Sequence, residues 1–467
     1  MPAPTPAFKS ARDFVLDELP FAREPEFEVC IVGTTALAEA CVRCGQSRRP
    51  AARDIDLAWR PEGDEALAIL ARYGFSASQT SGSEARGTLG IRSAKWRFEL
   101  TSFRGGGDSP SARIRNDALG RDMTIGAVLW RLHDDTIHDP QGGVGDWQRG
   151  ILRACGNAVE RIEEHPVRIL RYLRRAAELG FTVEEATRSA LRTRGAAAIA
   201  HILPEAAAEE LRRVLAGVSP GLFFAFAYEE RLLSALAPEL EPLFDGRPAG
   251  RLRWHPEQSQ GLHTILTLKI AAALADRSRL DDAARRRLIL GVLCHDLGKG
   301  LTEPHKMPSH PGHDAAGVPL VGSLLDRFPS LADRRARRFC EVVARNHLTL
   351  AQLRHLRAGT LVELWERDLA PMREDFPLLA AAVRADREGR LPPDLIGLPT
   401  RPGADFDGGA LERRVVRDLE ALDAILREVR GDEAAARHPR DPVKLRAMLH
   451  EMRSRAIHAA GFRNDEA

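Results

Sequence analysis

The sequence predicts an α+β fold in which an amino-terminal mixed α/β head is followed by an all-helical remainder. Three observations support this prediction: the length, the composition and a change of pattern near residue 125. The chain has 467 residues, of which 44% are hydrophobic and 29% are charged. This length is enough for about two to four domains. The composition is that of a folded globular protein rather than of a disordered or collagen-like chain.

Short apolar runs predict the strands of the head. Gly- and Ser-rich turns and stretches of helical period separate them, which is the pattern of a sheet with intervening helices. The expected strands are residues 28–32, 55–58 and 96–100.

Helices account for the rest of the chain. Long stretches rich in Ala, Leu, Arg and Glu follow the helical period and are broken by Pro or Gly. These stretches are residues 159–180, 183–201, 204–217, 221–236, 262–276, 281–294, 312–327, 331–346, 410–430 and 441–459. Further breaks at residues 246–250 and 397–409 divide the helical remainder.

Charge, cysteine usage and hydropathy narrow the class of protein. The 68 Lys and Arg residues nearly balance the 66 Asp and Glu residues, so the net charge of +2 does not indicate a polyanionic partner by itself. The six cysteines are scattered, and the amino-terminal segment lacks the pattern of a secretory signal, which predicts reduced thiols. No run approaches the ~20 apolar residues that span a bilayer. We therefore expect a cytoplasmic protein that has no contact with membranes.

Acidic residues mark a first candidate site. Asp54 and Asp56 are separated by one residue, and alternate residues of a strand point to the same face. Like charges this close are costly unless a divalent cation lies between them, although a solvated pair at a strand end is an alternative. Glu99 on the neighbouring expected strand offers a third carboxylate. Three carboxylates around two Mg²⁺ ions would activate a 3′-hydroxyl and neutralise the leaving pyrophosphate in a nucleotidyl transfer.

Two further features offer contacts to phosphate. Gly33 and Thr34 follow the first expected strand in a turn whose backbone N–H groups could hold a triphosphate. Arg168, Arg171 and Arg175 recur at i, i+3 and i+7, so they form one basic face of a helix. A solvated helix face and a contact to nucleotide or RNA phosphate are both open interpretations of this stripe.

Histidine and aspartate residues predict a second candidate site past the midpoint. The adjacent pair His295 and Asp296 is accompanied by further imidazoles and carboxylates in helical segments. These are His255, Glu257, His263, His310, His313, His347 and Asp386. Such ligands suit a divalent metal ion, which would activate water for attack on a phosphoester. Chance histidines near an acid-capped helix are the weaker alternative.

The motifs together resemble two known families. The first half is similar to the class II tRNA nucleotidyltransferase and poly(A) polymerase family, and the second half to the HD phosphohydrolase domain of bacterial CCA-adding enzymes. The motifs of the first half are Gly33, Asp54-x-Asp56, Arg121-Asp122-x-Thr124, Asp139-Pro, Asp146 and Glu164-x-Pro-x-Arg168. The motifs of the second half are residues 254–257, His263, residues 294–300 and residues 310–313.

The resemblance implies a division of the chain and a function. The enzyme would transfer CMP and AMP from CTP and ATP to the tRNA 3′ end, and its oligomeric state is left open, a homodimer included. The implied segments are an amino-terminal extension (1–25), a nucleotidyltransferase head (26–126), a helical neck and body that bind RNA and nucleotide (127–245), an HD phosphohydrolase domain (250–395) and a helical tail (396–467). Packing on the HD domain is the default expectation for the tail, with dimerisation or tRNA contact as alternatives.

The implied site residues fall into three groups. The expected catalytic residues are Asp54, Asp56, Glu99, His295 and Asp296. The expected nucleotide-binding residues are Gly33, Thr34, Arg121, Asp122, Glu164, His165, Arg168 and Arg171. The expected metal ligands are Asp54 and Asp56 for Mg²⁺ in the head, and His263, His295, Asp296 and Asp386 for a divalent ion of unknown identity in the HD domain.

The head departs from the pattern of the family, which leaves two hypotheses. The turn after the first expected strand lacks the Arg and the Asp that the family has there. Gly120 replaces an Arg of the family pattern, and Gly126 replaces an Asn. His165 stands where the base-reading motif has Asp. Neutral imidazole has one hydrogen-bond donor and one acceptor, whereas a carboxylate only accepts. The hydrogen-bond pattern that distinguishes the base of CTP from that of ATP therefore differs from the family's. The first hypothesis is a CCA-adding nucleotidyltransferase with an HD phosphohydrolase. The alternative is an HD phosphatase or 2′,3′-cyclic phosphodiesterase whose head only binds tRNA or nucleotide. The intact pair of Asp54 and Asp56 favours the first.

Overall fold

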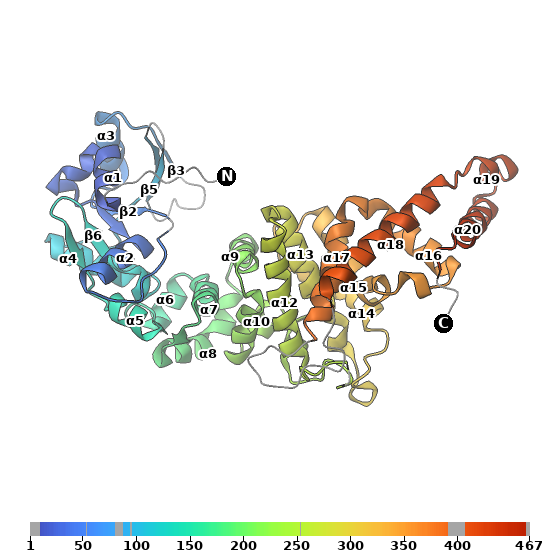
Figure 1. Ribbon diagram of the computed structural model, residues 1–467. Helices are drawn as coiled ribbons and strands as arrows, with labels where there is room; N and C mark the ends of the chain where they lie inside the picture. Colours follow the sequence, from blue (N-terminus) through green and yellow to red (C-terminus); the bar gives the residue numbers. More distant parts are fainter. Residues whose placement is uncertain are drawn as a thin grey trace. The chain divides into compact units, whose positions relative to one another are not determined.

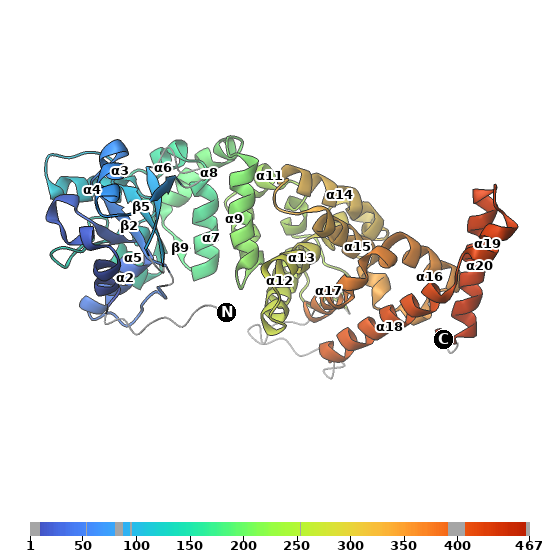
Figure 2. The ribbon, with the colours of Figure 1, turned by 90° about the horizontal axis from the view of Figure 1, so that it is seen from above.

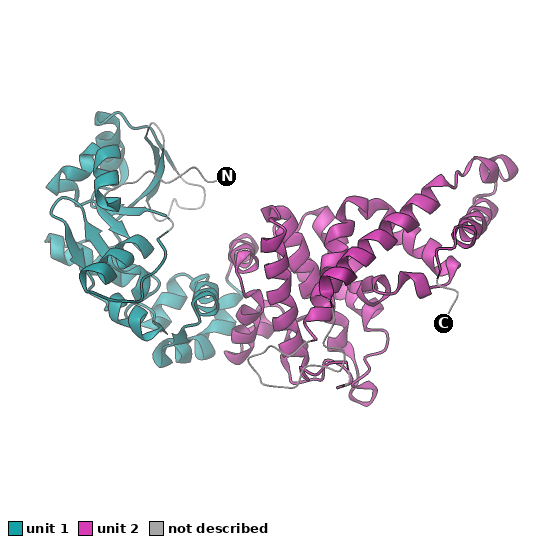
Figure 3. Cartoon of the chain, in the orientation of Figure 1, with its two compact units in different colours: residues 1–201 teal, residues 202–467 magenta. Residues whose placement is uncertain are grey.

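The computed structural model describes residues 10–52, 54–79, 87–93, 96–252, 254–390 and 407–463. The chain divides into two compact units, residues 1–201 and 202–467 (Figure 3). The first unit holds a mixed sheet with helices, and every element assigned in the described part of the second unit is a helix (Figure 1). The predicted α+β class is therefore confirmed. The division falls within residues 127–245, the expected neck and body.

Seven strands form the sheet of the first unit. They are β1 (Cys30–Val32), β2 (Asp56–Trp59), β3 (Ala77–Gln79), β4 (Thr88–Arg92), β5 (Arg97–Ser102), β6 (Leu129–Arg131) and β7 (Thr136–His138). Their order is β3-β4-β5-β2-β1-β6-β7, and neighbours pair antiparallel except β2 and β5, which are parallel. The three expected strands are confirmed as β1, β2 and β5, which are adjacent in the middle of the sheet.

Eight α-helices belong to the described part of the first unit (Figure 2). They are α1 (Ala11–Glu18), α2 (Thr34–Arg43), α3 (Gly63–Arg72), α4 (Pro110–Gly120), α5 (Gly143–Arg149), α6 (Ala158–Glu164), α7 (Arg168–Leu179) and α8 (Glu185–Ile199). A short parallel pair, β8 (Ile151–Leu152) and β9 (Thr182–Val183), lies among them. The stretch 159–180, expected as one helix, is two helices because Pro166 lacks an N–H donor and disfavours helical geometry before it.

Helix α4 is fixed against the central strands by its inner face. The hydroxyl of Ser109 accepts a hydrogen bond from the Ala112 N–H (3.3 Å), which caps the first turn. Ile114 is buried in one apolar cluster with Val32 of β1. The helix therefore ends, at Gly120, in a fixed position relative to the strands that carry the acidic residues.

The second unit is built from helices. They are α9 (Pro204–Ala216), α10 (Pro220–Glu229), α11 (Leu233–Leu236), α12 (Gln260–Arg277), α13 (Asp282–Cys294), α14 (His313–Arg327), α15 (Arg334–Leu350), α16 (Ala358–Leu364), α17 (Phe376–Glu388), α18 (Gly408–Glu428), α19 (Asp432–Arg437) and α20 (Pro442–Ala459). The stretch 221–236 is two helices, α10 and α11, separated at Arg231, whose φ is +61°. Helices α12, α13, α15 and α17 pack against one another, and α14 packs on α15.

The carboxyl-terminal part of the second unit adds helices that the sequence pattern had not indicated. The expected helical stretches leave out residues 347–409, yet α16, a π-helix at Trp365–Leu369 and α17 lie there. Pro377 interrupts the pattern but stands in the first turn of α17, where proline is tolerated. In the tail, α18 packs on α17 and α20 on α16. Across the described residues, no helix has both the length and the apolar character that a bilayer crossing requires.

Candidate functional site

Three carboxylates meet beside the amino end of β2. The parallel register sets Asp56 opposite Glu99 of β5, and Asp54 precedes the strand. The three residues are exposed at the surface. Protein atoms packed around Asp56 nevertheless displace part of the water near its carboxyl group and raise its pKa, and the charges of Asp54 and Glu99 raise it further. Carboxylates that oppose one another's ionisation form a site that a divalent cation stabilises, and oxygen ligands suit Mg²⁺.

The turn between β1 and α2 lies directly beside these carboxylates. Gly33 has a φ of +72°, and a Cβ atom there would lie 3.7 Å from Oδ2 of Asp56. Helix α2 begins at the next residue, Thr34, and its first N–H groups have no partner within the helix. The hydroxyl of Thr35 donates to the carbonyl of Asp54 (2.5 Å) and so holds the acidic loop against the helix. The amino end of α2 is thereby placed to receive an anion.

Arg121 and Asp122 follow α4 on the same unit. Arg121 Nε donates to Oδ2 of the buried Asp117 (2.8 Å). Burial is the main cause of the raised pKa of Asp56. The positive charge of Arg121 acts in the opposite direction and lowers this pKa. Arg171 Nη1 lies 3.6 Å from Asp122 Oδ2. Three of the expected nucleotide-binding residues are thus gathered at the end of α4.

Glu164, His165 and Arg168 lie at the junction of α6 and α7. Arg168 is buried, and its Nη1 donates to Glu164 Oε2 (3.0 Å) while its Nη2 donates to the carbonyl of Gly120 (2.8 Å). His165 ends α6 and is exposed. The expected base-reading residues are therefore anchored to the end of α4 by Arg168.

The aspartates of the expected motif at residues 139–146 have structural contacts instead of a place at the acidic site. Asp139 Oδ1 accepts a hydrogen bond from the N–H of Gly143, the first residue of α5 (2.7 Å). Asp146 is buried and accepts a hydrogen bond from the hydroxyl of Thr124 (2.7 Å). These bonds hold the segment that follows Arg121.

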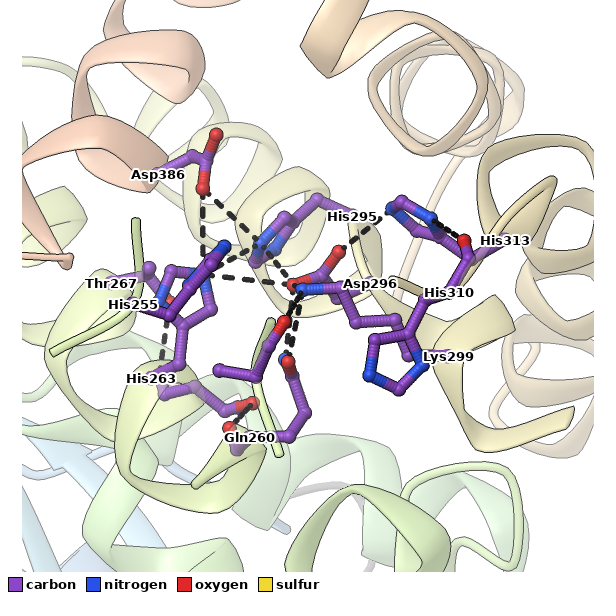
Figure 4. A network of polar contacts seen from close by, with 12 residues as sticks. His255, Gln260, His263, Thr267, His295, Asp296, Lys299, His310, His313 and Asp386 are labelled. Atoms are coloured by element: carbon purple, nitrogen blue, oxygen red, sulfur yellow. Dashed lines mark hydrogen bonds and ion pairs between the residues drawn. The ribbon is translucent and has the colours of Figure 1, made fainter. Parts of the chain in front are cut away.

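The four ligands expected in the HD domain converge in the second unit (Figure 4). His263 Nε2, on α12, lies 3.3 Å from His295 Nε2, 3.6 Å from Asp296 Oδ2 and 3.4 Å from Asp386 Oδ1. His295 Nε2 lies 3.0 Å from Asp296 Oδ2. All four side chains are buried. Two imidazole nitrogens and two carboxylate oxygens therefore surround one point.

The other oxygen of Asp296 faces a second pair of imidazoles. His313 Nε2, at the start of α14, lies 3.3 Å from Asp296 Oδ1, and His347 Nε2, on α15, lies 3.7 Å from it. Both histidines are among the imidazoles that the sequence offers as possible metal ligands, but the sequence leaves open whether they complete the metal shell. Their spacing along the chain gave no signal for that role, because a single histidine in a helix is usually a core or surface residue.

The donors at this centre fit a metal ion. The Nδ1–H groups of His295, His313 and His347 donate to backbone carbonyls at 2.6, 2.7 and 3.2 Å, so their Nε2 lone pairs are free to act as ligands. His263 Nδ1 lies 2.9 Å from Glu257 Oε1, although not aligned for a hydrogen bond. Within the described residues, Asp296 Oδ1 and His313 Nε2 are buried and make no hydrogen bond. Buried polar atoms of this kind require a partner, which a metal ion would provide.

Charged neighbours keep the acidic ligands ionised. Burial acts to raise the pKa of Asp296, but His295 and Lys299 hold it well below its usual range, and Lys299 Nζ lies 2.8 Å from Asp296 Oδ2. Burial also acts to raise the pKa of Asp386, but the charge of Arg390 holds it well below its usual range. Arg390 Nη2 lies 2.6 Å from Asp386 Oδ2. Burial and the charge of His295 lower the pKa of His347 to about 3, so this imidazole is neutral at pH 7.

The remaining histidines of the cluster have supporting contacts. His255 Nδ1 lies 2.7 Å from Glu257 Oε1, and His310 Nε2 donates to the carbonyl of Pro248 (2.7 Å). These contacts attach the loop before α12 to the wall of the site.

The fold and the two sites define a nucleotidyltransferase head joined to a helical, metal-binding HD domain. In agreement, residues 40–153 match the poly A polymerase head domain family, and residues 261–386 match the HD domain family. Both domain types are in general dependent on divalent metal ions. Among the described residues, the groups of three or more potential ligand atoms that lie close together are all in the second unit.

Comparison with known proteins is more specific. The chain is 32% identical to the multifunctional CCA protein of Nitrosococcus oceani over 90% of this chain and 92% of that protein. It is 34% identical to the multifunctional CCA protein of Stenotrophomonas maltophilia over 60% of this chain and 67% of that protein. The chain therefore belongs to the family of the multifunctional CCA proteins, and it is a nucleotidyltransferase.

Solved structures share the fold. The Bacillus stearothermophilus CCA-adding enzyme in complex with CTP has a TM-score of 0.58 at 19% identity, covering 98% of this chain and 94% of that one. The Thermotoga maritima CCA-adding enzyme complexed with tRNA has a TM-score of 0.52 at 15% identity, covering 87% and 82%. At this identity the likeness supports the fold alone.

Proposed function

We propose that this enzyme adds C, C and A to the 3′ end of tRNA from CTP and ATP without a nucleic-acid template. The observation that carries the proposal is the strand register that sets Asp56 opposite Glu99 and beside Asp54, in a chain of this family. A head that only binds tRNA would have no use for three carboxylates at one place. Because tRNA and both nucleotides are cytoplasmic, we expect the enzyme to act there.

In the head, Asp54 and Asp56 are the proposed ligands of Mg²⁺, with Glu99 beside them. A bound Mg²⁺ supplies the positive charge that stabilises the reacting phosphoryl group. The turn at Gly33 and Thr34 directs N–H groups of α2 towards the triphosphate. Arg121, Asp122 and Arg171 lie at the end of α4 and are proposed to contact the nucleotide.

Base selection is assigned to the junction of α6 and α7. Glu164 and Arg168 are held together by their ion pair, and Arg168 is fixed to the carbonyl of Gly120. His165 stands beside them on the exposed side of the junction. We propose that these three residues contact the Watson–Crick edge of the incoming base, with imidazole in place of the carboxylate that the family uses.

In the HD domain, His263, His295, Asp296 and Asp386 are the proposed ligands of one divalent ion. Asp296 Oδ1, with His313 and His347, is proposed to hold a second ion, because both imidazoles face that oxygen. Such ions polarise a phosphoester and supply a nucleophile from water. The proposed substrates are phosphomonoesters and 2′,3′-cyclic phosphates, and the expected catalytic residues are His295 and Asp296.

Extension of a tRNA that lacks its terminal CCA tests the proposal. The purified chain with Mg²⁺, CTP and ATP is expected to restore all three nucleotides. The double variant Asp54→Ala, Asp56→Ala is expected to abolish the reaction, whereas Asp64→Ala, an exposed acid on α3, is the matched control. Absence of any incorporation by folded wild-type protein with all four nucleotides would favour the head that only binds.

A further inference from the structure

Arg104 is a half-buried cation of the first unit, with 31% of its side chain exposed, and the sequence motifs do not include it. It follows β5, and its backbone N–H donates to Asp117 Oδ1 (3.0 Å). Its guanidinium makes only a long ion pair with the same oxygen, at 3.5 Å from Nη1. The Nη1 atom is buried and makes no hydrogen bond to any residue that the structure describes. This guanidinium therefore has donors left for a further partner.

The side chain of Arg104 occupies the space over Gly120, the last residue of α4. A Cβ atom on Gly120 would lie 2.9 Å from Arg104 Cβ and 3.0 Å from its Cδ, so any larger residue at this position would displace the arginine. The carbonyl of the same glycine accepts the hydrogen bond from Arg168. Arg104 is thus packed against the end of α4, beside a residue proposed to read the base.

Positive charge is in excess around this position. Asp117 already forms an ion pair with Arg121, whose Nη2 lies 2.8 Å from Asp117 Oδ2. Burial lowers the pKa of Arg104 to about 10, and the charges of Arg121 and Arg168 contribute to this shift. Arg104 and Arg121 thus share the single carboxylate of Asp117. A further anion would stabilise the guanidinium of Arg104, whose fork of donors matches the oxygens of a phosphate.

We propose that Arg104 binds a phosphate group of the incoming nucleotide in the head. This inference rests on the proposed transfer function and adds a residue to its substrate site. The nucleotide is favoured over tRNA as the source of the phosphate because Arg104 packs against Gly120. The carbonyl of Gly120 holds Arg168, and the next residue is Arg121, and both arginines are proposed to contact the nucleotide.

The test is equilibrium binding of CTP, CDP, CMP and cytidine to the full chain with Mg²⁺ present, measured by calorimetry. Loss of a charge-assisted hydrogen bond predicts that Arg104→Ala weakens CTP binding by about 10- to 100-fold. Cytidine binding is expected to stay within about twofold, so the preference for CTP over cytidine falls. Arg104→Lys is expected to recover part of the preference for CTP over cytidine. Arg115→Ala, an exposed position on α4, is the matched control.

A second variant separates position from charge. Gly120→Ala leaves every charge in place but forces the Arg104 side chain to move. We therefore expect this variant to weaken CTP binding as Arg104→Ala does. Equal weakening of CTP, CMP and cytidine by Arg104→Ala would mean a structural role and would overturn the inference, as would unchanged CTP binding. Weakened binding of tRNA alone, with CTP binding intact, would assign the phosphate to tRNA and overturn the nucleotide assignment. Failure of the wild-type chain to extend tRNA, by contrast, would overturn the proposed function itself.

Discussion

Replacing Glu257 is expected to weaken metal binding in the HD domain, although Glu257 is not a proposed ligand. Three of the four imidazoles at the centre hold their Nδ1–H groups on backbone carbonyls, which no substitution removes. His263 depends instead on the side chain of Glu257, at 2.9 Å. Burial acts to raise the pKa of Glu257, but the imidazoles of His255 and His263 lower it to about 2, so it is a full negative charge at pH 7.

Loss of such an outer carboxylate costs about 10- to 100-fold in metal affinity, or about 1.4–2.8 kcal/mol. We expect this loss for Glu257→Ala, and a smaller one for Glu257→Gln because the amide oxygen keeps a partial negative charge beside His263 Nδ1. The assay is Mn²⁺ titration by calorimetry of chains that also carry Asp54→Ala and Asp56→Ala, so that the head does not contribute. His305→Ala, with 70% of its side chain exposed, is the control. An unchanged dissociation constant in folded Glu257→Ala would refute the role of Glu257 in orienting His263.

Three further predictions follow from the geometry. Asp296→Asn removes an oxygen charge shared by both imidazole pairs, so hydrolysis of 2′,3′-cyclic nucleotides should fall by at least about 100-fold while tRNA extension is retained; parallel loss of both activities would contradict two separate sites. Gly33→Ala forces a side chain into left-handed geometry at about 1 kcal/mol and moves the turn beside Asp56; we expect slower extension in the primer assay with hydrolysis unchanged. His165→Asp replaces a donor and acceptor by an acceptor only, so the ratio of CTP to ATP incorporation on a truncated tRNA should change; an identical ratio would place His165 outside base selection.

The metal centre of the HD domain illustrates what the sequence can and cannot predict. The adjacent pair His295 and Asp296 belongs to a recognisable motif, and His263 and Asp386 follow from its pattern. The role of His313 and His347 was left open, because their approach to the second oxygen of Asp296 depends on how α14 and α15 pack. Tertiary packing of this kind leaves no local signal in the chain.

The head gives the same lesson at Arg104. Strand alternation predicts Asp54 and Asp56 on one face of a strand, but β2 begins only at Asp56, so Asp54 lies in the segment before it. The pairing of Asp56 with Glu99 is what strand register provides. Arg104 belongs to no motif, and its position depends on a side chain that is missing, at Gly120. The sequence marked Gly120 only as a departure from the family. In the structure the same glycine leaves the space that the aliphatic part of the Arg104 side chain occupies.

The charge distribution of the head distinguishes transfer chemistry from binding alone. A protein that only held tRNA would need basic groups, and acidic ones would repel the phosphates of the RNA. Here Asp54, Asp56 and Glu99 are kept together. The pKa of Asp56 is raised first by loss of water around its carboxyl group and then by the charges of Asp54 and Glu99. Basic groups gather at the end of α4, where Arg121 contacts Asp117 and Arg171 lies near Asp122. Carboxylates can hold a divalent ion and guanidinium groups can bind phosphate, so the two sets together fit the handling of a nucleotide with its metal ion.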